Sequence, residues 1–246
     1  MLKKNIVLFL CILFSLAGNA SALAATYYAS PVGSATSCTL ESPCKLNTAL
    51  GKLTAGYTLY LREGTYNQTV SLGKSGTSAS RIIVSGYPNE TAIIDGRRSI
   101  PGFLGVRSFN PLFSVTGNYV TIQDLHIKNS NGTGLELRGN YDYAINLLIE
   151  GNNEQGILVF GGYNLVDNCD VFNNAYSNYG GIMSAGWAGG IMMCQGGHHS
   201  TVQHSRSWNN WGEGISSWSG DSGISDYNTI QDNISYNNYS NPALSG

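Results

Sequence analysis

From about residue 120 onward, short segments with alternating hydrophobic and polar residues recur, and each segment ends in asparagine. Five copies are present: Val120–Asn129, Ile145–Asn152, Leu165–Asn173, Thr201–Asn209 and Thr229–Asn237. Their equivalent inward-facing residues, separated by 22, 22, 36 and 28 positions, are Ile127, Ile149, Val171, Ser207 and Ser235. Alternation with a period of two predicts strands, and a repeat of this length predicts stacked units. The pattern therefore predicts an all-β parallel β-helix, in which each coil adds a strand to several parallel sheets.

Residues 26–65 are expected to form a cap over the first coil, and residues 66–246 the coils themselves. Leu46, Leu50 and Leu53 keep the i, i+4, i+7 spacing of a short amphipathic helix. A cap is required because the terminal coil of a solenoid exposes unpaired strand edges. Further strands are expected at 57–61, 81–85 and 92–95.

The first 24 residues have the features of a secretory signal peptide. Lys3 and Lys4 precede an apolar run over residues 6–16, and Ala22-Leu23-Ala24 resembles a cleavage site. The run is too short for a membrane span. We therefore expect a secreted, periplasmic or cell-surface domain over residues 25–246, with no membrane span after signal removal.

The composition narrows the choice of partners. Charged residues are only 11% of the chain, well below the quarter typical of soluble domains, while Gly contributes 31 residues, as turn-rich stacked strands require. The net charge is −2. Because nucleic-acid binding needs a basic surface to neutralise phosphates, we expect no nucleic-acid partner.

The cysteines indicate one disulfide. Cys38 and Cys44 bracket a five-residue loop in a chain expected to be exported, so a bond between them is predicted. Cys169 falls on an inward position and is expected to be an ordinary buried residue. A bridge between Cys169 and Cys194 is the alternative.

Several segments resemble the opening of secreted right-handed parallel β-helix proteins of the pectate-lyase-like, or polysaccharide-lyase-like, superfamily: Thr26–Gly33, Ser42–Lys45, Leu59–Tyr66, Ser85–Pro88 and Ile93–Gly96. The resemblance covers essentially the whole mature chain. It implies an exported lyase that cleaves an acidic polysaccharide of the pectate or alginate type by β-elimination. The superfamily also contains hydrolases, epimerases and members without known activity. A noncatalytic glycan-binding or structural solenoid is therefore the alternative, and a monomer is expected in either case.

Alternation also places two outward-facing columns on one sheet. They are His126, Leu148, Asp170, Arg206 and Ile234, and beside them Lys128, Glu150, Phe172, Trp208 and Tyr236. Asp170 is expected beside Arg206, and Lys128 beside Glu150. The three aromatic residues are expected to stack. These columns are either solvated ion pairs with a β-favouring aromatic ladder, or a strip that binds sugar rings and uronate carboxylates.

β-Elimination requires neutralisation of the uronate carboxylate and a base that removes the C5 proton. The resemblance implies Ca²⁺ or cationic side chains for the first task, and Lys, Arg or His for the second. The candidate catalytic residues are Arg206, Lys128, His198 and Glu213. The candidate substrate-binding residues are Trp208, Phe172, Tyr236, Trp211, Asp170 and His204. Glycoside hydrolysis by paired carboxylates among Asp167, Asp170 and Glu213 is a further alternative.

Three carboxylates near one rim, Glu213, Asp221 and Asp226, are either turn residues or a Ca²⁺ site with oxygen ligands.

The long third coil inserts residues 174–200, which are rich in glycine, methionine and aromatic residues. We expect this insertion to form one wall of a cleft, because long excursions from a rigid scaffold are usually functional or disordered. Residues 240–246 contain no closing cap, so the sequence predicts a β-helix truncated at its C-terminus.

Overall fold

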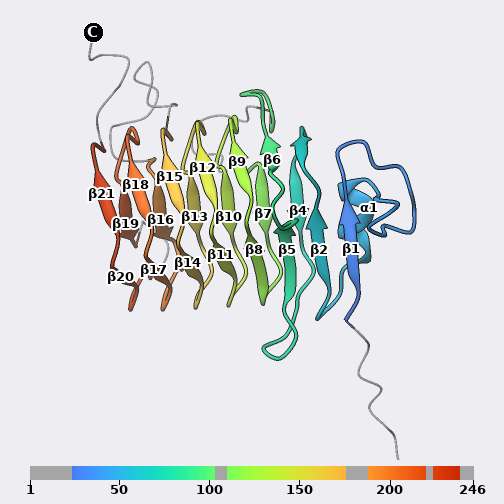
Figure 1. Ribbon diagram of the computed structural model, residues 1–246. Helices are drawn as coiled ribbons and strands as arrows, with labels where there is room; N and C mark the ends of the chain where they lie inside the picture. The colour runs from blue at the N-terminus through green and yellow to red at the C-terminus, as the bar shows by residue number, and fades with distance from the viewer. Residues whose placement is uncertain (1–23, 103–109, 176–187, 220–223, 239–246) are drawn as a thin grey trace, which may run out of the picture.

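The protein is a parallel β-helix. The computed structural model describes residues 24–102, 110–175, 188–219 and 224–238. In Figure 1 the coils stack side by side from the blue N-terminal end, where the helix lies, to the red C-terminal end. All strand pairs within the three sheets are parallel, as the repeated segments predicted.

The three sheets are called A, B and C here. Sheet A has the order β1 (Thr26–Ala29), β2 (Thr58–Leu61), β5 (Ile82–Gly86), β8 (Val120–Gln123), β11 (Tyr143–Ile145), β14 (Leu165–Asp167), β17 (Thr201–Gln203) and β20 (Thr229–Gln231). Sheet B has the order β3 (Gly64–Tyr66), β6 (Ala92–Asp95), β9 (His126–Lys128), β12 (Leu148–Glu150), β15 (Asp170–Phe172), β18 (Arg206–Trp208) and β21 (Ile234–Tyr236). Sheet C has the order β4 (Val70–Leu72), β7 (Phe113–Val115), β10 (Leu135–Leu137), β13 (Ile157–Val159), β16 (Ile191–Cys194) and β19 (Ile215–Trp218).

Each repeated segment forms two strands, where the sequence pattern predicted one. The segment Val120–Asn129, for example, contains β8 in sheet A and β9 in sheet B, joined by Asp124 and Leu125. Asp124 has φ 55, a left-handed conformation that ends the first strand and turns the chain. Asn and Asp reach this conformation more easily than most residues, which explains their recurrence at this corner.

The N-terminal segment contains the expected helix. Helix α1 (Leu46–Lys52) buries Leu46 and Leu50, and Leu53 follows it as a buried cap residue. Strand β1 already pairs with β2, so the first strand of this segment belongs to sheet A. The disulfide between Cys38 and Cys44 is present, as predicted. The helices of the described part of the chain include none with the length and hydropathy needed to cross a bilayer.

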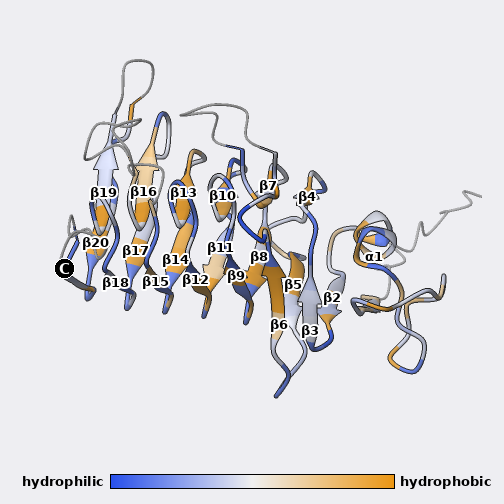
Figure 2. Cartoon of the chain, turned by 90° about the horizontal axis from the view of Figure 1, so that it is seen from above, coloured by the Kyte–Doolittle hydropathy of each residue, from blue (hydrophilic) through white to orange (hydrophobic). Residues whose placement is uncertain are grey.

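The core is a continuous column of side chains between the three sheets. Ile127, Ile149 and Val171 are fully buried, as predicted, and so is Ser207. Ser235 is exposed because it lies on β21, the last strand of its sheet. The hydrophobic colouring recurs from one coil to the next in Figure 2.

Cys169 and Cys194 are both buried and free. The alternative of a bridge between them is therefore wrong. Cys169 lies at the bend between β14 and β15, whereas Cys194 ends β16 in sheet C. Burial raises the pKa of the Cys169 thiol to about 12, so it remains a thiol within the core.

Buried amides satisfy backbone groups at the turn between sheets B and C. Asn174 Oδ1 accepts from the backbone N–H and from Nδ2 of Asn152, at 3.1 and 2.8 Å. Asn210 Oδ1 accepts the equivalent pair from Asn174, both at 3.0 Å. These contacts repeat from coil to coil because a buried backbone N–H must find an acceptor. They keep successive coils in register.

Candidate functional site

The outer face of sheet B carries the two columns expected from the alternation. Strands β9 and β12 place Lys128 opposite Glu150. Strands β15 and β18 place Asp170 opposite Arg206. Side chains from distant parts of the sequence therefore share one wall of the molecule, as the in-register repeats predicted.

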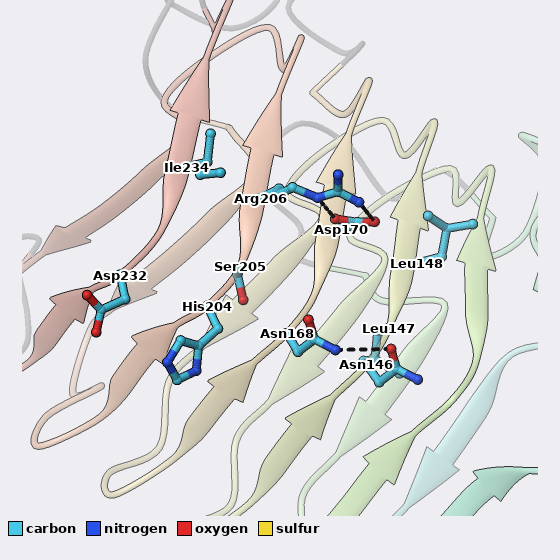
Figure 3. Close-up of a pocket in the computed structure, with 10 residues that line it drawn as sticks. All are labelled: Asn146, Leu147, Leu148, Asn168, Asp170, His204, Ser205, Arg206, Asp232 and Ile234. Atoms are coloured by element: carbon cyan, nitrogen blue, oxygen red, sulfur yellow. Dashed lines mark hydrogen bonds and ion pairs between the residues drawn. The ribbon is translucent and has the colours of Figure 1, made fainter.

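The predicted contact between Asp170 and Arg206 is a bidentate ion pair. Arg206 Nε donates to Asp170 Oδ1 at 2.6 Å, and Nη2 donates to Oδ2 (Figure 3). The hydrogen bonds that Arg206 donates to Asp170 raise the pKa of Arg206. Because the Arg206 side chain is 56% exposed, the pair contributes little to stability. Its guanidinium remains accessible to a ligand.

The predicted aromatic ladder is also present. The rings of Phe172 and Trp208 stack with centroids 4.4 Å apart, and those of Trp208 and Tyr236 with centroids 5.9 Å apart. The faces of these rings therefore contact one another. A sugar approaching this part of sheet B meets ring edges more than ring faces.

A groove follows the corner between sheets A and B. It consists of two pockets, of about 430 and 510 Å³, which share the lining residues Asn146 and Leu148. The first pocket extends toward Ile234 on the last coil (Figure 3). The second extends toward Tyr60 near the first coil. The two pockets therefore form one groove along the helix axis, which we call the A–B groove.

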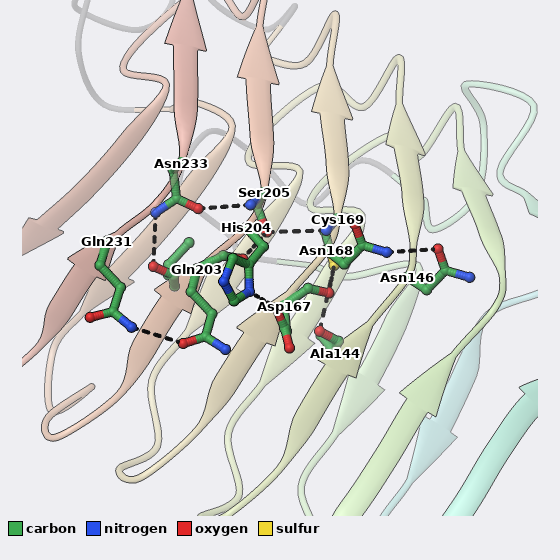
Figure 4. A network of polar contacts seen from close by, with 11 residues as sticks. Ala144, Asn146, Asp167, Asn168, Cys169, Gln203, His204, Ser205, Gln231 and Asn233 are labelled. Carbon is green, nitrogen blue, oxygen red and sulfur yellow. Dashed lines mark hydrogen bonds and ion pairs between the residues drawn. The ribbon is translucent and has the colours of Figure 1, made fainter.

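Polar residues in the left-handed conformation line the corner beside this groove. With φ between 49 and 55, they are Asp124, Asn146, Asn168, His204 and Asp232. Asn168 Nδ2 donates to Asn146 Oδ1 at 3.3 Å (Figure 4), and Asn146 Nδ2 donates to Asp124 Oδ1 at 2.6 Å. His204, a predicted substrate-binding residue, bonds Asp167 Oδ1 through Nδ1 at 2.9 Å. The lining thus presents hydrogen-bonding side chains at intervals of one coil.

Aromatic and charged residues line the groove at its N-terminal end. The guanidinium of Arg62 lies 4.8 Å from the centre of the Tyr87 ring. Arg62 Nε also donates to Glu90 Oε2 at 2.7 Å, and this hydrogen bond lowers the pKa of Glu90. Tyr60 packs edge-on against Tyr87, with centroids 5.6 Å apart. This end of the groove therefore combines aromatic surface with a fixed ion pair.

His126 lies in the middle of the A–B groove and was not among the predicted site residues. Its Nε2 lies 3.0 Å from Glu150 Oε1, and it lines the pocket that Tyr87 also lines. Burial lowers the pKa of His126, and Glu150 opposes that shift. Lys128 lies two residues further along the same face of β9, about 6.6 Å away at strand spacing. The structure thus places the predicted Lys128 beside a histidine and a glutamate.

The predicted catalytic residues do not converge on one point. Strands β12 and β15 lie between β9 and β18. The positions of Lys128 and Arg206 are therefore about 14 Å apart along sheet B. The two cations share a wall but cannot act on the same sugar carboxylate.

His198, Glu213 and Trp211 lie away from the A–B groove. His198 is at the corner between sheets C and A, edge-on to Tyr163 with centroids 5.3 Å apart. Glu213 lies in the turn between β18 and β19, where its carbonyl accepts from the Gly190 N–H at 2.8 Å. Trp211 packs near the same turn. The structure therefore separates His198 and Glu213 from the other two predicted catalytic residues.

The predicted Ca²⁺ ligands are also apart where they are described. Strand β19 lies between Glu213 and Asp226 in the chain, and Asp221 lies outside the described residues. Within the described residues, no three His, Cys, Asp or Glu side chains form a group that could hold a metal ion. The Ca²⁺ site therefore stays a prediction. The central part of the insertion expected to form a cleft wall, 176–187, also lies outside the described residues.

The carboxylates considered for glycoside hydrolysis are likewise engaged or separated. Asp167 ends β14 in sheet A, and Asp170 begins β15 in sheet B, so they do not share a strand. Asp167 contacts His204, and Asp170 contacts Arg206. Another carboxylate, Glu136, is buried on β10, where Arg138 Nη2 donates to it at 2.8 Å. Burial raises the pKa of Glu136.

A second stacked column was missed in the sequence. At the corner between sheets C and A, successive coils contribute Tyr119, Tyr141, Tyr163, His199 and Tyr227, with adjacent ring centroids 4.7 to 4.9 Å apart. These residues recur with the same spacings of 22, 22, 36 and 28 as the inward-facing column. The repeat spacing could therefore have identified them.

The geometry of the chain agrees with the comparison with protein families. A family described as "Pel9A-like, right handed beta helix region" matches residues 27–245. The chain belongs to this family. The membership confirms the right-handed parallel β-helix and the pectate-lyase-like resemblance inferred from the N-terminal motifs.

Individual relatives are more distant. Pectate lyase PEL9 from Emericella nidulans is 40% identical over 84 residues, which cover 32% of this chain and 20% of the relative. Uncharacterized protein YwoF from Bacillus subtilis is 32% identical over 116 residues, which cover 44% of this chain and 24% of the relative. The chain thus matches about a quarter or less of the length of these two relatives.

Solved structures share the fold. Pectate lyase Pel9A superimposes with a TM-score of 0.75 at 21% identity, over 90% of this chain and 56% of Pel9A. An alginate lyase from Paenibacillus sp. str. FPU-7 superimposes with a TM-score of 0.57 at 19% identity, over 86% of this chain and 76% of that enzyme. At these identities the similarity establishes the fold alone.

Proposed function

We propose that this protein is exported, binds a uronate-containing polysaccharide of the pectate or alginate type, and cleaves it by β-elimination. The observation that carries the proposal is the A–B groove, which crosses successive coils along the helix axis. A linear polymer fits such a groove because its repeating units meet successive coils, whereas small ligands are usually enclosed in a single pocket. The similarity to a pectate lyase and an alginate lyase supports a polysaccharide as substrate.

Lys128 is assigned to the carboxylate of the sugar that is cleaved. Its strand neighbours in register are Asp95 and Glu150, yet within the described residues no carboxylate lies within ion-pair distance of its ammonium group. An ammonium in that position lowers the cost of developing negative charge at C5. Arg206, about 14 Å along the same sheet, is assigned to the carboxylate of another sugar in the chain.

Calcium remains part of the proposal as a requirement to be tested. Glu213 and Asp226 carry the carboxylate oxygens that Ca²⁺ prefers, but they lie on either side of strand β19 in the chain. Because the described residues do not bring a third carboxylate to them, no step of the reaction is assigned to the metal.

The experiment is a product assay on polygalacturonate and alginate, with Ca²⁺ supplied and after chelation. β-Elimination creates a C4=C5 double bond, whose ultraviolet absorbance reports the product. We expect product from one of these polymers, and a loss of about 100-fold or more in kcat for Lys128→Met. Arg206→Ala should raise KM more than it lowers kcat, because it removes a contact distant from the bond that breaks.

Lys45→Met is the matched control, because Lys45 is exposed beside α1 and outside the A–B groove. It should behave as the wild type. Absence of unsaturated product from both polymers, with Ca²⁺ present, would contradict lyase activity.

A noncatalytic glycan-binding solenoid is the second candidate. It is favoured by the engagement of two cations, since Arg206, which lines the groove, pairs with Asp170, and Arg62 pairs with the groove residue Glu90. Calorimetric titration with uronate oligosaccharides separates the two candidates. Saturable binding without unsaturated product would support the second candidate and exclude the first.

A further inference from the structure

Glu150 fixes the orientation and the tautomer of His126. The carboxylate Oε1 lies 3.0 Å from His126 Nε2. An ionised carboxylate only accepts hydrogen bonds, so the neutral imidazole carries its proton on Nε2 and a lone pair on Nδ1. The arrangement resembles the base-and-orienting-carboxylate pair found in many enzymes that move protons. Glu150 touches His126 from the neighbouring strand β12 and is therefore a positioning residue.

His126 is also placed where a bound polymer would pass. It lines the A–B groove together with Tyr87, Asp124 and Leu148. Leu148 is its register partner on β12 and is shared by both halves of the groove. The histidine is thus near the centre of the groove, where sugars on either side of the cleaved bond could both be held.

Burial favours the neutral form of His126, and the charges around it act in both directions. Burial is the main cause of its lowered pKa, and Lys128 on the same strand lowers it further. Glu150 on β12 and Asp95 on β6 act in the opposite direction. Two further carboxylates, Glu90 and Asp124, line the same half of the groove.

We propose that His126 is the general base of the lyase reaction, oriented by Glu150 and working beside the Lys128 ammonium; this assignment rests on the proposed lyase function. His126 Nδ1 takes the C5 proton of the uronate. The electron pair of the C5–H bond forms the C4=C5 double bond, and the C4–O glycosidic bond breaks. The leaving oxygen takes a proton from water, and the imidazolium returns its proton to solvent. No oxidant or reductant is needed.

The test is the pH dependence of kcat/KM on the polymer that the wild type cleaves. General bases commonly contribute a factor of 10² to 10⁴. We therefore expect His126→Gln to lower kcat by about 100-fold or more. Because the pKa of His126 is lowered from 6.5, the wild-type acid limb should lie below pH 6.5.

Two charge variants move that acid limb in opposite directions. Lys128→Met removes a positive charge that lowers the pKa of His126, so the pKa should rise. The acid limb of the residual activity should therefore move to a higher pH. Glu150→Gln removes a negative charge that raises that pKa, so the limb should move to a lower pH. A merely structural role for these residues would change rates without shifting the limb in these directions.

His199→Asn is the matched histidine control. His199 lies at the corner between sheets C and A, on a left-handed position that asparagine tolerates. It should retain the wild-type pH profile. An active wild type with an unchanged His126→Gln variant would overturn the assignment of the base alone, whereas an inactive wild type would overturn the lyase function and this assignment with it.

Discussion

At the corner between sheets A and B, each described coil from β8 onward turns through a left-handed residue that is polar, such as Asp124 or Asn146. At the corner between sheets C and A, the residue in the same conformation is aromatic, such as Tyr141 with φ 61. The polar column contributes donors and acceptors to the A–B groove. In the aromatic column, the rings of successive coils stack on one another. The same backbone turn therefore builds a candidate binding surface at one corner and a structural ladder at the other.

The energetic basis of the two columns differs accordingly. Tyrosine is uncommon in the left-handed region, and each such residue costs of order 1 kcal/mol. Stacking of aligned aromatic rings contributes about 0.5–1.5 kcal/mol for each pair, which offsets that cost. Asn146 accepts the conformation more readily and keeps its amide for neighbouring side chains. Stability and binding should therefore respond differently to substitutions at the two corners.

The largest expected effect is at a buried position beneath the aromatic column. Asn164 donates from Nδ2 to the Gly139 carbonyl at 3.0 Å. One coil earlier, Asp142 occupies the equivalent place, and its Oδ2 has no hydrogen-bond partner in the described part of the chain. Burial raises the pKa of Asp142 to about 7. Asp142→Asn would supply an amide that can donate as Asn164 does, here to the Gly117 carbonyl, because that carbonyl oxygen and the Oδ2 of Asp142 both lie beside Gly139.

The pH dependence follows from the raised pKa. Below about pH 4 the carboxyl is protonated in both the folded and the unfolded chain. As the pH rises to about 7, only the unfolded chain ionises, so the free energy of unfolding of the wild type falls. We expect Asp142→Asn to be more stable than the wild type by roughly 2–4 kcal/mol at pH 8, with the difference shrinking toward pH 4. Urea denaturation at both pH values measures it, and a difference independent of pH would contradict the assignment.

A smaller loss of stability is expected from breaking the aromatic ladder. Tyr141→Asn keeps a residue that tolerates the left-handed conformation but removes stacking on both Tyr119 and Tyr163. The free energy of unfolding should fall by about 1–2 kcal/mol. Binding of uronate oligosaccharides, measured by calorimetry, should be unchanged. A weaker affinity would show that the aromatic corner also takes part in binding.

The smallest effect on stability, paired with an effect on binding, is expected at the polar corner. Asn146→Gly keeps the left-handed turn at little cost and removes the amide that bonds Asp124. Asn146→Ala removes the same amide and adds backbone strain of about 1 kcal/mol. Both variants should bind uronate oligosaccharides more weakly, and only the alanine variant should unfold more easily. Equal affinity of both variants and the wild type would exclude this corner from the binding surface.

Much of the fold follows from the sequence because the repeat is local and regular. The spacing of Ile127, Ile149 and Val171 determines which side chains share a column, and the register of sheet B confirms it. The bend within each repeated segment was missed, although the inward apolar positions change phase across Asp124, from Val120 and Ile122 to Leu125 and Ile127. The left-handed φ of Asp124, which depends on backbone conformation and not on hydropathy, interrupts the strand.

Less of the candidate site than of the fold could be predicted from the sequence. The ion pair between Asp170 and Arg206 follows from register alone, since the two residues are direct neighbours. The contact of His126 with Glu150 is diagonal, between residues that are not register partners. It depends on side-chain reach and burial, which a pattern of alternating residues does not contain.

The A–B bend is two residues long in every coil from β8 onward. The additional residues of the longer coils fall elsewhere, at 173–190 between sheets B and C and at 219–228 between sheets C and A. Insertions can therefore change what surrounds the groove while its pitch stays fixed by the strand separation of about 4.8 Å. Duplication of a single coil would lengthen the groove by one rung, which gives this architecture a simple evolutionary route to longer polymers.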